Sequence, residues 1–411
     1  MDRHPADPRT APARPADGPP ASIGVCVVGP GTRFVSGITY YTYSLIRALD
    51  PDQRISAILL RRLLPRRLYP GHQRVGADLT RLALPSGVPV AKRVDWFWGP
   101  GTLEAIRLLR DQRPEILLLQ WWSGAALHTY LLLAWAARRL GISLVVEFHE
   151  VLDTGEDRLG WVRRYVELLG PALWRRTAAF VVHNEHDREL IQRRFQLDPV
   201  RVAVIPHPAY DLFPRQDAPH GDDTIRLLFF GVVRPFKGLE DLVAAFNIVA
   251  GSGTGNFRLT VIGESWENWA LPEEMIARSP VKQWIERVNR YVTDEEAEAA
   301  FGEADVVVLP YRRCSSSGPL HIAMGMGLPV VSTRVGGIPE ATSAYPGAVL
   351  ANPADPESLA QAILVAASLR GRKFEGAASW QTAAQAYSHL FRRLAPVRKE
   401  GQRRRSRTQP G

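Results

Sequence analysis

The stretch DVVVLPYRRCSSSGPLHIAMGMGLPVVSTRVGGIPE, residues 305–340, alternates between short apolar runs and polar loops. Residues 305–310 form a valine-rich run, which is typical of a buried strand. Residues 311–318 are a polar loop, and the mostly apolar residues 320–326 predict a buried helix that ends at Gly-Leu-Pro. Residues 330–332 predict the next strand. This order of strand, helix and strand favours an α/β fold with a parallel sheet.

The loop ends in three consecutive serines, Ser315 to Ser317, followed by Gly318. This sequence places hydroxyl and backbone N–H groups at a helix N-terminus, beyond the carboxyl end of a strand. Open α/β sheets bind ligands at that edge, and a helix start favours an anion such as phosphate. The alternative is that the serines only cap the helix, as serine commonly does.

A second stretch, FFGVVRPFKGLEDL at residues 229–242, follows a predicted strand at 225–230 and precedes a predicted helix at 238–249. Arg234 and Lys237 lie in the turn between them. Two cations beside a helix start form a plausible diphosphate clamp, because arginine offers a planar fork of donors and lysine a point charge. The alternative is two solvated loop cations, the usual state of surface lysine and arginine.

Together the two stretches resemble the carboxyl-terminal half of the retaining glycosyltransferases of family 4, which have the GT-B architecture. The resemblance extends from about residue 23 to about residue 395. The motifs occur in the family's order and spacing, at Gly231, Arg234-Pro-Phe-Lys237-Gly238, Ser317-Gly318, Gly327-Leu-Pro329-Val-Val331 and Gly336-Gly337-Ile-Pro-Glu340.

The resemblance implies an α/β fold of the GT-B type, with two Rossmann-like, doubly wound parallel-sheet domains that face a cleft. It also implies metal-independent transfer of a sugar, with retention, from a nucleotide-diphosphate-sugar to a lipid-linked, polysaccharide or small-molecule acceptor. The nucleotide-sugar would be a co-substrate, and no cofactor or metal is expected. The implied catalytic residues are His149, Arg234 and Lys237, and the implied donor-binding residues are Gly37, Gly231, Ser317, Gly318, Leu320, His321 and Glu340.

His149 follows a predicted strand at residues 143–148, which we expect to deliver Glu147, His149 and Glu150 to the cleft. Family members carry a functional histidine at this strand end. A neutral imidazole there would hydrogen-bond a sugar hydroxyl and fix the ring for attack. The alternative is a structural histidine that caps the loop at residues 147–153.

One departure from the family pattern concerns two glutamates that usually stand eight positions apart around the serine loop. Those positions are Cys314 and Ile322 here. The second glutamate usually holds the ribose of the donor, so the sequence leaves the ribose contact open. His321 is a candidate substitute, although a histidine at this position more often packs or caps.

The chain divides into five parts by composition and pattern. These are a disordered tail at 1–21, an acceptor domain at 22–212, a donor domain at 221–379, a helix at 380–396 that packs back on the first domain, and a basic tail at 397–411. The predicted strands lie at 23–29, 55–60, 116–120, 143–148, 178–182 and 202–205, then at 225–230, 258–262, near Tyr291, 305–310 and 330–332.

The 411 residues carry a formal net charge of +9 but no nucleic-acid recognition motif. Anionic membrane lipid or a phosphorylated substrate is therefore the favoured partner. Residues 61–70 and Trp96 to Trp98 are candidates for membrane contact, with an ordinary basic loop and core packing as the alternatives. The apolar segment 125–140 is too short to span a bilayer.

Two cysteines, Cys26 and Cys314, do not make a disulfide framework, which favours a reduced, cytoplasmic protein that is peripheral to the membrane at most. Asp50-Pro-Asp52 matches the metal-binding DxD pattern of other glycosyltransferases, but its place after a helix end indicates a turn. Two further functions stay open. One is an inactive GT-B binding or assembly subunit, and the other is a nucleotide-sugar epimerase on the same architecture.

Overall fold

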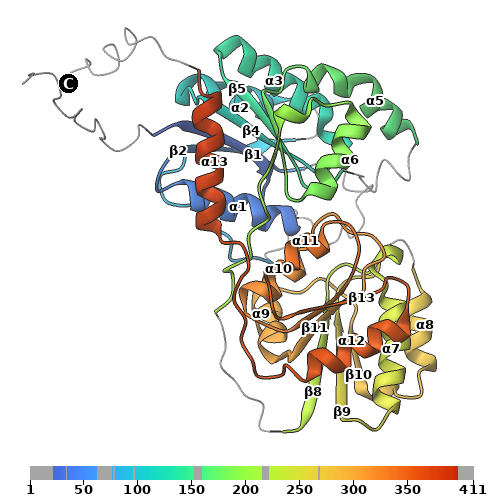
Figure 1. The fold of residues 1–411 in the computed structure, drawn as a ribbon. Coiled ribbons are helices and arrows are strands. Elements are labelled where there is room, and N and C mark those ends of the chain that lie inside the picture. Colours follow the sequence, from blue (N-terminus) through green and yellow to red (C-terminus); the bar gives the residue numbers. More distant parts are fainter. Residues whose placement is uncertain are drawn as a thin grey trace, which may run out of the picture.

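A computed structural model describes residues 22–33, 35–62, 76, 79–95, 98–151, 160–214, 222–266 and 269–396. The expected tails at 1–21 and 397–411, most of residues 61–70, and Trp96 with Phe97 lie outside the described residues. Figure 1 shows two α/β domains, one above the other, with the last helix running back along the first domain.

The first domain is built on a seven-stranded sheet in the order β3-β2-β1-β4-β5-β6-β7, in which every pairing is parallel. The strand bounds are β1 (Gly24–Pro30), β2 (Arg54–Leu60), β3 (Val90–Val94), β4 (Ile116–Trp121), β5 (Ser143–Phe148), β6 (Ala179–Val182) and β7 (Val202–Val204). The central strands are apolar and buried on both faces, as a parallel sheet covered by helices requires.

Helices cover both faces of this sheet. One core joins the sheet to α2 (Pro100–Gln112), α3 (Leu127–Leu140), α5 (Gly160–Trp174) and α6 (Glu185–Phe195). The other joins it to α1 (Gly37–Leu49) and α13 (Trp380–Leu394). The chain returns to its first domain because the apolar face of α13, with Tyr387 and Phe391, is buried against the sheet and α1.

The second domain has a six-stranded parallel sheet in the order β10-β9-β8-β11-β12-β13. Its strands are β8 (Thr224–Phe230), β9 (Asn256–Ile262), β10 (Ile285–Val288), β11 (Val306–Leu309), β12 (Val330–Thr333) and β13 (Ala348–Ala351). One core contains α7 (Leu239–Gly251) and α12 (Pro356–Ala367), and the opposite core contains α9 (Asp294–Glu303), α10 (Gly318–Gly325) and α11 (Ile338–Thr342). The short helix α8 (Leu271–Arg278) packs beside α7.

The doubly wound parallel fold predicted from the sequence is confirmed. The strand predicted near Tyr291 is wrong, because β10 lies at Ile285–Val288, and two edge strands, β3 and β13, were missed. The strand order reverses between β1 and β4 in the first sheet and between β8 and β11 in the second. Crevices open at such switch points, beyond the carboxyl ends of the strands.

Candidate functional site

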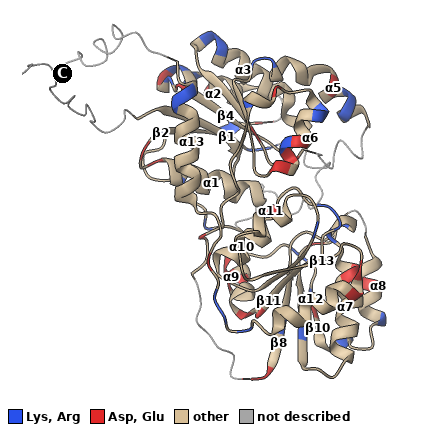
Figure 2. Cartoon of the chain, in the orientation of Figure 1, with Lys and Arg blue, Asp and Glu red and all other residues tan. Residues whose placement is uncertain are grey.

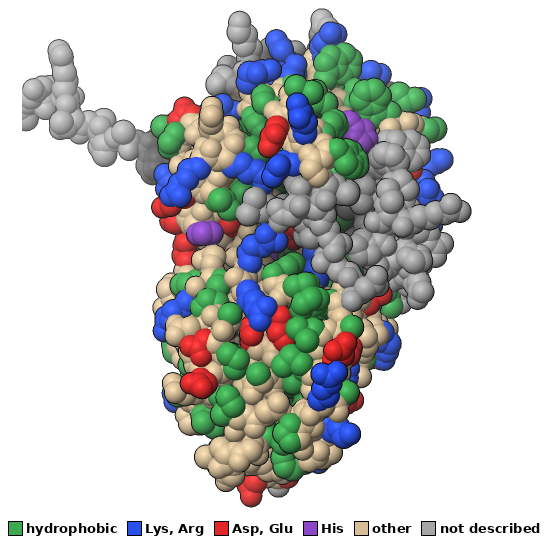
Figure 3. Space-filling model, turned by 90° about the vertical axis from the view of Figure 1, so that its right-hand side faces the viewer, with side chains coloured by type: hydrophobic (Ala, Val, Ile, Leu, Met, Phe, Trp, Pro, Cys, Tyr) green, Lys and Arg blue, Asp and Glu red, His purple; other side chains and the backbone are tan. Residues whose placement is uncertain are grey.

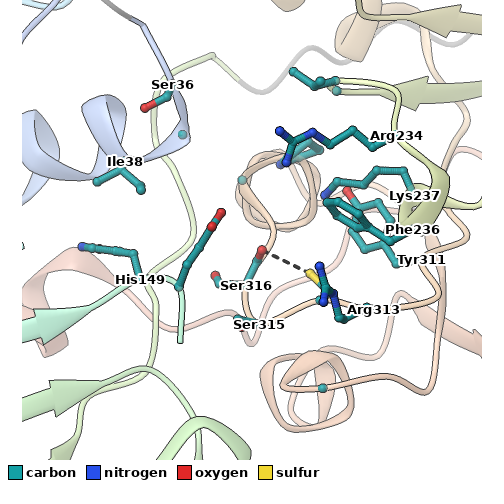
Figure 4. Close-up of a pocket in the computed structure, with 18 of the residues that line it drawn as sticks. Ser36, Ile38, His149, Arg234, Phe236, Lys237, Tyr311, Arg313, Ser315 and Ser316 are labelled. Atoms are coloured by element: carbon teal, nitrogen blue, oxygen red, sulfur yellow. Dashed lines mark hydrogen bonds between the residues drawn. The ribbon is translucent and has the colours of Figure 1, made fainter. Parts of the chain in front are cut away.

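A pocket of about 700 Å³ lies where the two switch points meet, between the domains. Its walls follow the carboxyl ends of strands from both sheets. Ser36 and Gly37 come after β1, and His149 comes after β5. The segment 231–237 follows β8, and the loop 311–316 follows β11. Figure 4 shows Ser36, Ile38 and His149 on one side of the pocket and Arg234, Lys237 and Arg313 on the other.

Cationic side chains line the wall that belongs to the second domain. Arg234, Lys237, Arg312 and Arg313 all line the pocket, whereas Glu150 is the one carboxylate that does so among the described residues. Arg312 is neutralised by Asp241 and Glu240, at 2.7 and 2.8 Å. The other three cations give the wall a positive charge, which favours an anionic ligand.

Aromatic rings hold the two predicted clamp residues in place. The guanidinium of Arg234 lies 4.7 Å from the ring centre of Trp266, and the Lys237 ammonium lies 3.9 Å from that of Tyr311. Burial disfavours the charged form of Lys237, but Tyr311, Cys314 and Glu150 raise its pKa above the usual value. Lys237 is therefore positively charged at neutral pH.

Two helices begin at the pocket from opposite domains. Gly37 is the first residue of α1 and Gly318 the first of α10. A Cβ atom on Gly318 would lie 4.0 Å from the Cα of Gly37, so the two helix starts approach closely without side chains between them. Neither first turn carries an acidic residue. Both helix dipoles therefore add positive potential at the pocket.

The serine loop divides its roles between capping and the pocket. The Ser317 hydroxyl accepts a hydrogen bond from the Leu320 N–H at 3.3 Å, lies 2.9 Å from the Tyr311 hydroxyl, and is buried. Ser317 therefore caps the helix, as the alternative interpretation of the serine loop expected, and it does not line the 700 Å³ pocket. Ser315 and Ser316 line it instead (Figure 4), and the buried Ser316 hydroxyl has no hydrogen-bond partner in the described structure.

A smaller adjoining cavity of about 220 Å³ contains the other predicted donor-binding residues. Ser317, Leu320, His321 and Glu340 line this cavity, and Ser315 and Ser316 separate it from the main pocket. His321 is buried against His207, with ring centres 3.9 Å apart. Gly231, by contrast, lines the main pocket directly.

Glu340 makes a contact between the domains. Its carboxylate accepts a hydrogen bond of 2.7 Å from the N–H of Glu185, the first residue of α6. Another hydrogen bond crosses the interface nearby, from the Asn184 side chain to the Ser315 carbonyl at 3.3 Å. These contacts hold the two pocket walls together in this conformation.

His149 lines the pocket on the side of the first domain and is buried. Its Nδ1 is 3.3 Å from Nε2 of His183, whose own Nδ1 lies 3.0 Å from the Ile205 carbonyl. A carbonyl can only accept, so Nδ1 of His183 carries a proton. Burial holds the pKa of His183 down to about 4, so its ring is neutral and its Nε2 accepts from His149.

This arrangement leaves Nε2 of His149 facing Glu147, 3.5 Å from a carboxylate oxygen. Glu147 is fully buried, and the expectation that it lines the cleft is wrong. Its oxygens accept hydrogen bonds from Tyr387 of α13 and, at 3.1 Å, from Gln120. Burial alone would raise its pKa, but His149, His183 and Tyr387 lower the pKa to about 2, so Glu147 is ionised.

Glu147, His149 and His183 are also a group, within the described residues, whose ligand atoms are close enough to hold a metal ion, within 4.8 Å of one another. In this structure those atoms are paired with one another, with Tyr387 and with Gln120. The predicted turn at Asp50-Pro-Asp52 does follow α1, and none of its residues lines the pocket.

Cys314 and Ile322, where the resembled family has glutamates, both line the pocket. Burial raises the pKa of the Cys314 thiol to about 11, so it offers no charge. Sequence reasoning missed several lining residues, among them Tyr40, Trp266 and Tyr291. Trp266 is placed by a parallel bridge between Val233 and Ser265, which no local pattern signals.

Two family models match most of the chain. "Glycosyl transferase 4-like domain" matches residues 36–208, and "Glycosyl transferases group 1" matches residues 224–368. The first match covers most of the first domain and the second covers the parallel sheet of the second domain. Both walls of the pocket therefore lie in matched segments.

Curated relatives match over part of their length. The chain is 34% identical over 138 residues to a D-inositol 3-phosphate glycosyltransferase of Pseudarthrobacter chlorophenolicus, covering 33% of this chain and 32% of the relative. It is 29% identical over 188 residues to the enzyme of that name from Segniliparus rotundus, covering 41% of each chain. The match thus spans about a third to two fifths of these relatives.

Solved structures match over nearly the whole chain at low identity. A glycosyltransferase from Rickettsia africae aligns with a TM-score of 0.63 and 12% identity, covering 92% of this chain and 100% of that one. Sucrose-phosphate synthase from Thermosynechococcus elongatus aligns with a TM-score of 0.62 and 17% identity, covering 90% and 98%. Anabaena HepE in complex with UDP and glucose aligns with a TM-score of 0.62 and 12% identity, covering 90% of this chain and 99% of that one. At identities this low, these matches show a shared fold and nothing further.

Proposed function

Because the chain belongs to the GT-B glycosyltransferases of the family-4 type, we propose that its pocket transfers a sugar from a nucleotide-diphosphate-sugar to an acceptor. The observation that supports this proposal is that Arg234, Lys237 and the N-termini of two helices lie at one pocket. The acceptor is a lipid-linked, glycan or small-molecule hydroxyl. Transfer proceeds with retention of the anomeric configuration.

The donor assignment is supported by the charge of the pocket and by what fold neighbours bind. HepE was solved with UDP and glucose, and a trehalose-6-phosphate protein of E. coli with UDP-2-fluoro glucose. A diphosphate carries the negative charge that the wall of Arg234, Lys237 and the α10 start would neutralise. The volume of about 700 Å³ is in the range of pockets for cofactor-sized ligands.

The chemical step breaks the glycosidic bond to the diphosphate, and negative charge builds on the departing oxygen. Preorganised cations and N–H dipoles stabilise that charge in the transition state, by about 2–4 kcal/mol for a single donor in comparable sites. The proposal also assigns His149, on the opposite wall, to bind a sugar hydroxyl and orient the ring, which requires its imidazole to exchange its contact with Glu147 or His183 for one with the sugar. This scheme uses no divalent metal, because the cations of the protein take that role.

The test of this proposal is transfer or hydrolysis of a panel of nucleotide-sugars by purified protein. Arg234→Ala and Lys237→Ala should each lower turnover at least ten-fold with an unchanged melting temperature, because each removes transition-state charge stabilisation. Arg278→Ala, an exposed cation on α8, is the matched control and should keep wild-type turnover. Wild-type rates in both pocket variants would contradict the assignment.

The same assay in EDTA tests metal independence, since full activity is expected there. Loss of activity that manganese or magnesium restores would contradict it. A protein that binds nucleotide-sugar in a thermal-shift experiment without turning it over would instead be a binding subunit.

The acceptor and the cellular site follow from the same proposal. Within the part of the chain that the structure describes, no helix is both long and apolar enough to cross a bilayer. We propose a protein of the cytoplasm that contacts the inner face of the membrane, where a lipid-linked acceptor would be presented. The net charge of +9 supports attraction to anionic lipid.

A further inference from the structure

Large hydrophobic side chains are exposed mainly on one side of the first domain. Seven of the exposed large hydrophobic residues in the described structure lie on or next to α2, α3 and α5, and they include three tryptophans. The side chains of Trp98, Trp161 and Leu168 are 62%, 68% and 76% exposed. The others elsewhere are scattered singly, at Val200, Ile248, Leu271 and Val365.

The three helices form one continuous surface. The middle helix, α3, packs against α2 on one side and α5 on the other. The Trp98 indole donates a hydrogen bond of 3.3 Å to the His128 carbonyl, which joins the segment before α2 to α3. We call this surface the outer helical face. It comprises Trp98, Leu103, Trp135, Leu140, Trp161, Leu168 and Leu169, with the arginines named below.

Each helix combines large apolar residues with arginine at helical spacing. On α5, Trp161, Arg164 and Leu168 are three and four residues apart, so they lie on one face of the helix. On α3, the guanidinium of Arg139 lies 4.9 Å from the ring centre of Trp135. The pattern is therefore a mixture of apolar and cationic side chains, not an apolar patch within a polar rim.

The charge of the outer helical face is strongly positive. The helices and the residues directly after them contain nine arginines and three acidic residues. Figure 2 shows blue segments on α3 and α5, and Figure 3 shows hydrophobic and basic side chains together over the first domain. The arginines are Arg107, Arg110, Arg113, Arg138, Arg139, Arg163, Arg164, Arg175 and Arg176, and the acidic residues are Glu104, Asp111 and Glu167.

We propose that the outer helical face docks the protein on an anionic lipid bilayer. Tryptophan is favoured at the boundary between headgroups and acyl chains, because its ring is apolar and its N–H is polar. Arginine extends from an apolar stem toward lipid phosphates, which it binds with two donors. Exposed apolar side chains and cations on adjacent helices match both layers of such an interface.

This inference rests on the membrane contact proposed above and names its surface, but it does not depend on glycosyl transfer. It also differs from the contact predicted from the sequence, which used residues 61–70 and Trp96 to Trp98. Only Trp98 is shared. The variants described below distinguish the two surfaces, because they change residues of the outer helical face and none of residues 61–70 or 96–98.

The experiment is co-sedimentation of the full-length protein with vesicles of phosphatidylcholine alone or with phosphatidylglycerol. The triple variant Trp135→Gln/Trp161→Gln/Leu168→Gln should bind anionic vesicles at least ten-fold more weakly than wild type. The matched control, Ile248→Gln/Leu271→Gln/Val365→Gln, removes three exposed apolar residues from the second domain and should bind like wild type. Both variants change only exposed side chains, so their melting temperatures should equal that of wild type.

A second variant, Arg138→Gln/Arg139→Gln/Arg164→Gln, should lose binding at low salt, where wild type binds most strongly. Equal binding by wild type and the tryptophan variant would overturn the proposal, as would equal binding to neutral and anionic vesicles. A concentration-dependent dimer that the tryptophan variant abolishes, without vesicle binding, would assign the face to a second copy. Donor hydrolysis measured without vesicles should be unchanged in all variants, so failure here leaves the proposed function standing.

Discussion

At the scale of single residues, the link between Glu147 and His149 is open to a direct test. Glu147 is buried and ionised, and one of its oxygens lies 3.5 Å from Nε2 of His149. His149→Ala should lower turnover per folded molecule at least ten-fold with nucleotide affinity nearly unchanged, and it should also lower the melting temperature, because it leaves the buried charge of Glu147 without its nearest partner. Glu147→Gln should lower turnover per folded molecule and shift its pH profile, because it removes the charge that orients the imidazole.

The control for this prediction is the double variant. If Glu147 acts through His149, then His149→Ala/Glu147→Gln should turn over no more slowly per folded molecule than His149→Ala alone. Additive losses would show that Glu147 acts independently. The amide of Glu147→Gln also faces the donors of Tyr387 and Gln120, so a stability loss of about 1–3 kcal/mol is expected and must be measured separately.

At the scale of elements, a row of buried histidines connects the ends of β5 and β6 with the 205–213 segment and α10. Its members are His149, His183, His207 and His321. Burial lowers the pKa of His183 to about 4 and that of His321 to about 3, and it holds the pKa of His207 well below its usual value. These rings are neutral in the folded protein but take up protons below about pH 6.5 when it unfolds. Protonation therefore favours the unfolded state, and stability should fall as pH decreases below about 6.5.

Each such histidine contributes a slope of about 1.4 kcal/mol per pH unit between its folded and unfolded pKa values. Below about pH 4.5, the ionised Glu147 adds a further loss in the same direction, since its folded pKa is about 2. Denaturant melts at pH 7 and pH 5 would measure the slope. His183→Gln should reduce it, whereas the exposed His389→Gln should not. A slope that His183→Gln leaves unchanged would contradict this account.

The elements also show what the sequence can and cannot predict. Strands such as Ile116–Trp121 are buried on both faces, so their continuous apolar runs identify them. The edge strand β3, Val90–Val94, carries two exposed cations and was missed for that reason. Arg234 and Lys237 were placed correctly on the pocket because one local turn carries both.

Glu147 was misplaced because its environment is not local. It lies near the end of β5, two residues before His149, and closeness to the strand end alone predicts that both residues reach the cleft. The side chain of Tyr387, 240 residues further along the chain, donates a hydrogen bond to Glu147, which is fully buried and does not line the pocket. The smaller cavity that holds His321 and Glu340 likewise depends on how the domains meet, which no sequence pattern specifies.

At the scale of the whole molecule, the first domain is completed by the last helix. Phe391 of α13 is fully buried in the core that includes Tyr41 and Leu45 of α1. Phe391→Ala should lower the unfolding free energy by about 3–5 kcal/mol, the usual range for this truncation in a core. Hydrogen exchange should increase in β1 and α1 but not in β8 and β9. Faster exchange confined to α13 would show that the helix is dispensable.

The return of α13 to the first domain has a consequence for biosynthesis. Residues 24–204 leave the ribosome long before residues 380–394, so the face of the first sheet that α13 covers stays open to water meanwhile. The second domain, whose strands and helices lie between residues 224 and 367, has all of its elements earlier. Although domains generally fold in the order of their synthesis, here the amino-terminal domain must finish last. A nascent chain stalled before residue 380 would therefore display an unfinished apolar surface, and it is at this stage that a chaperone would find its binding site.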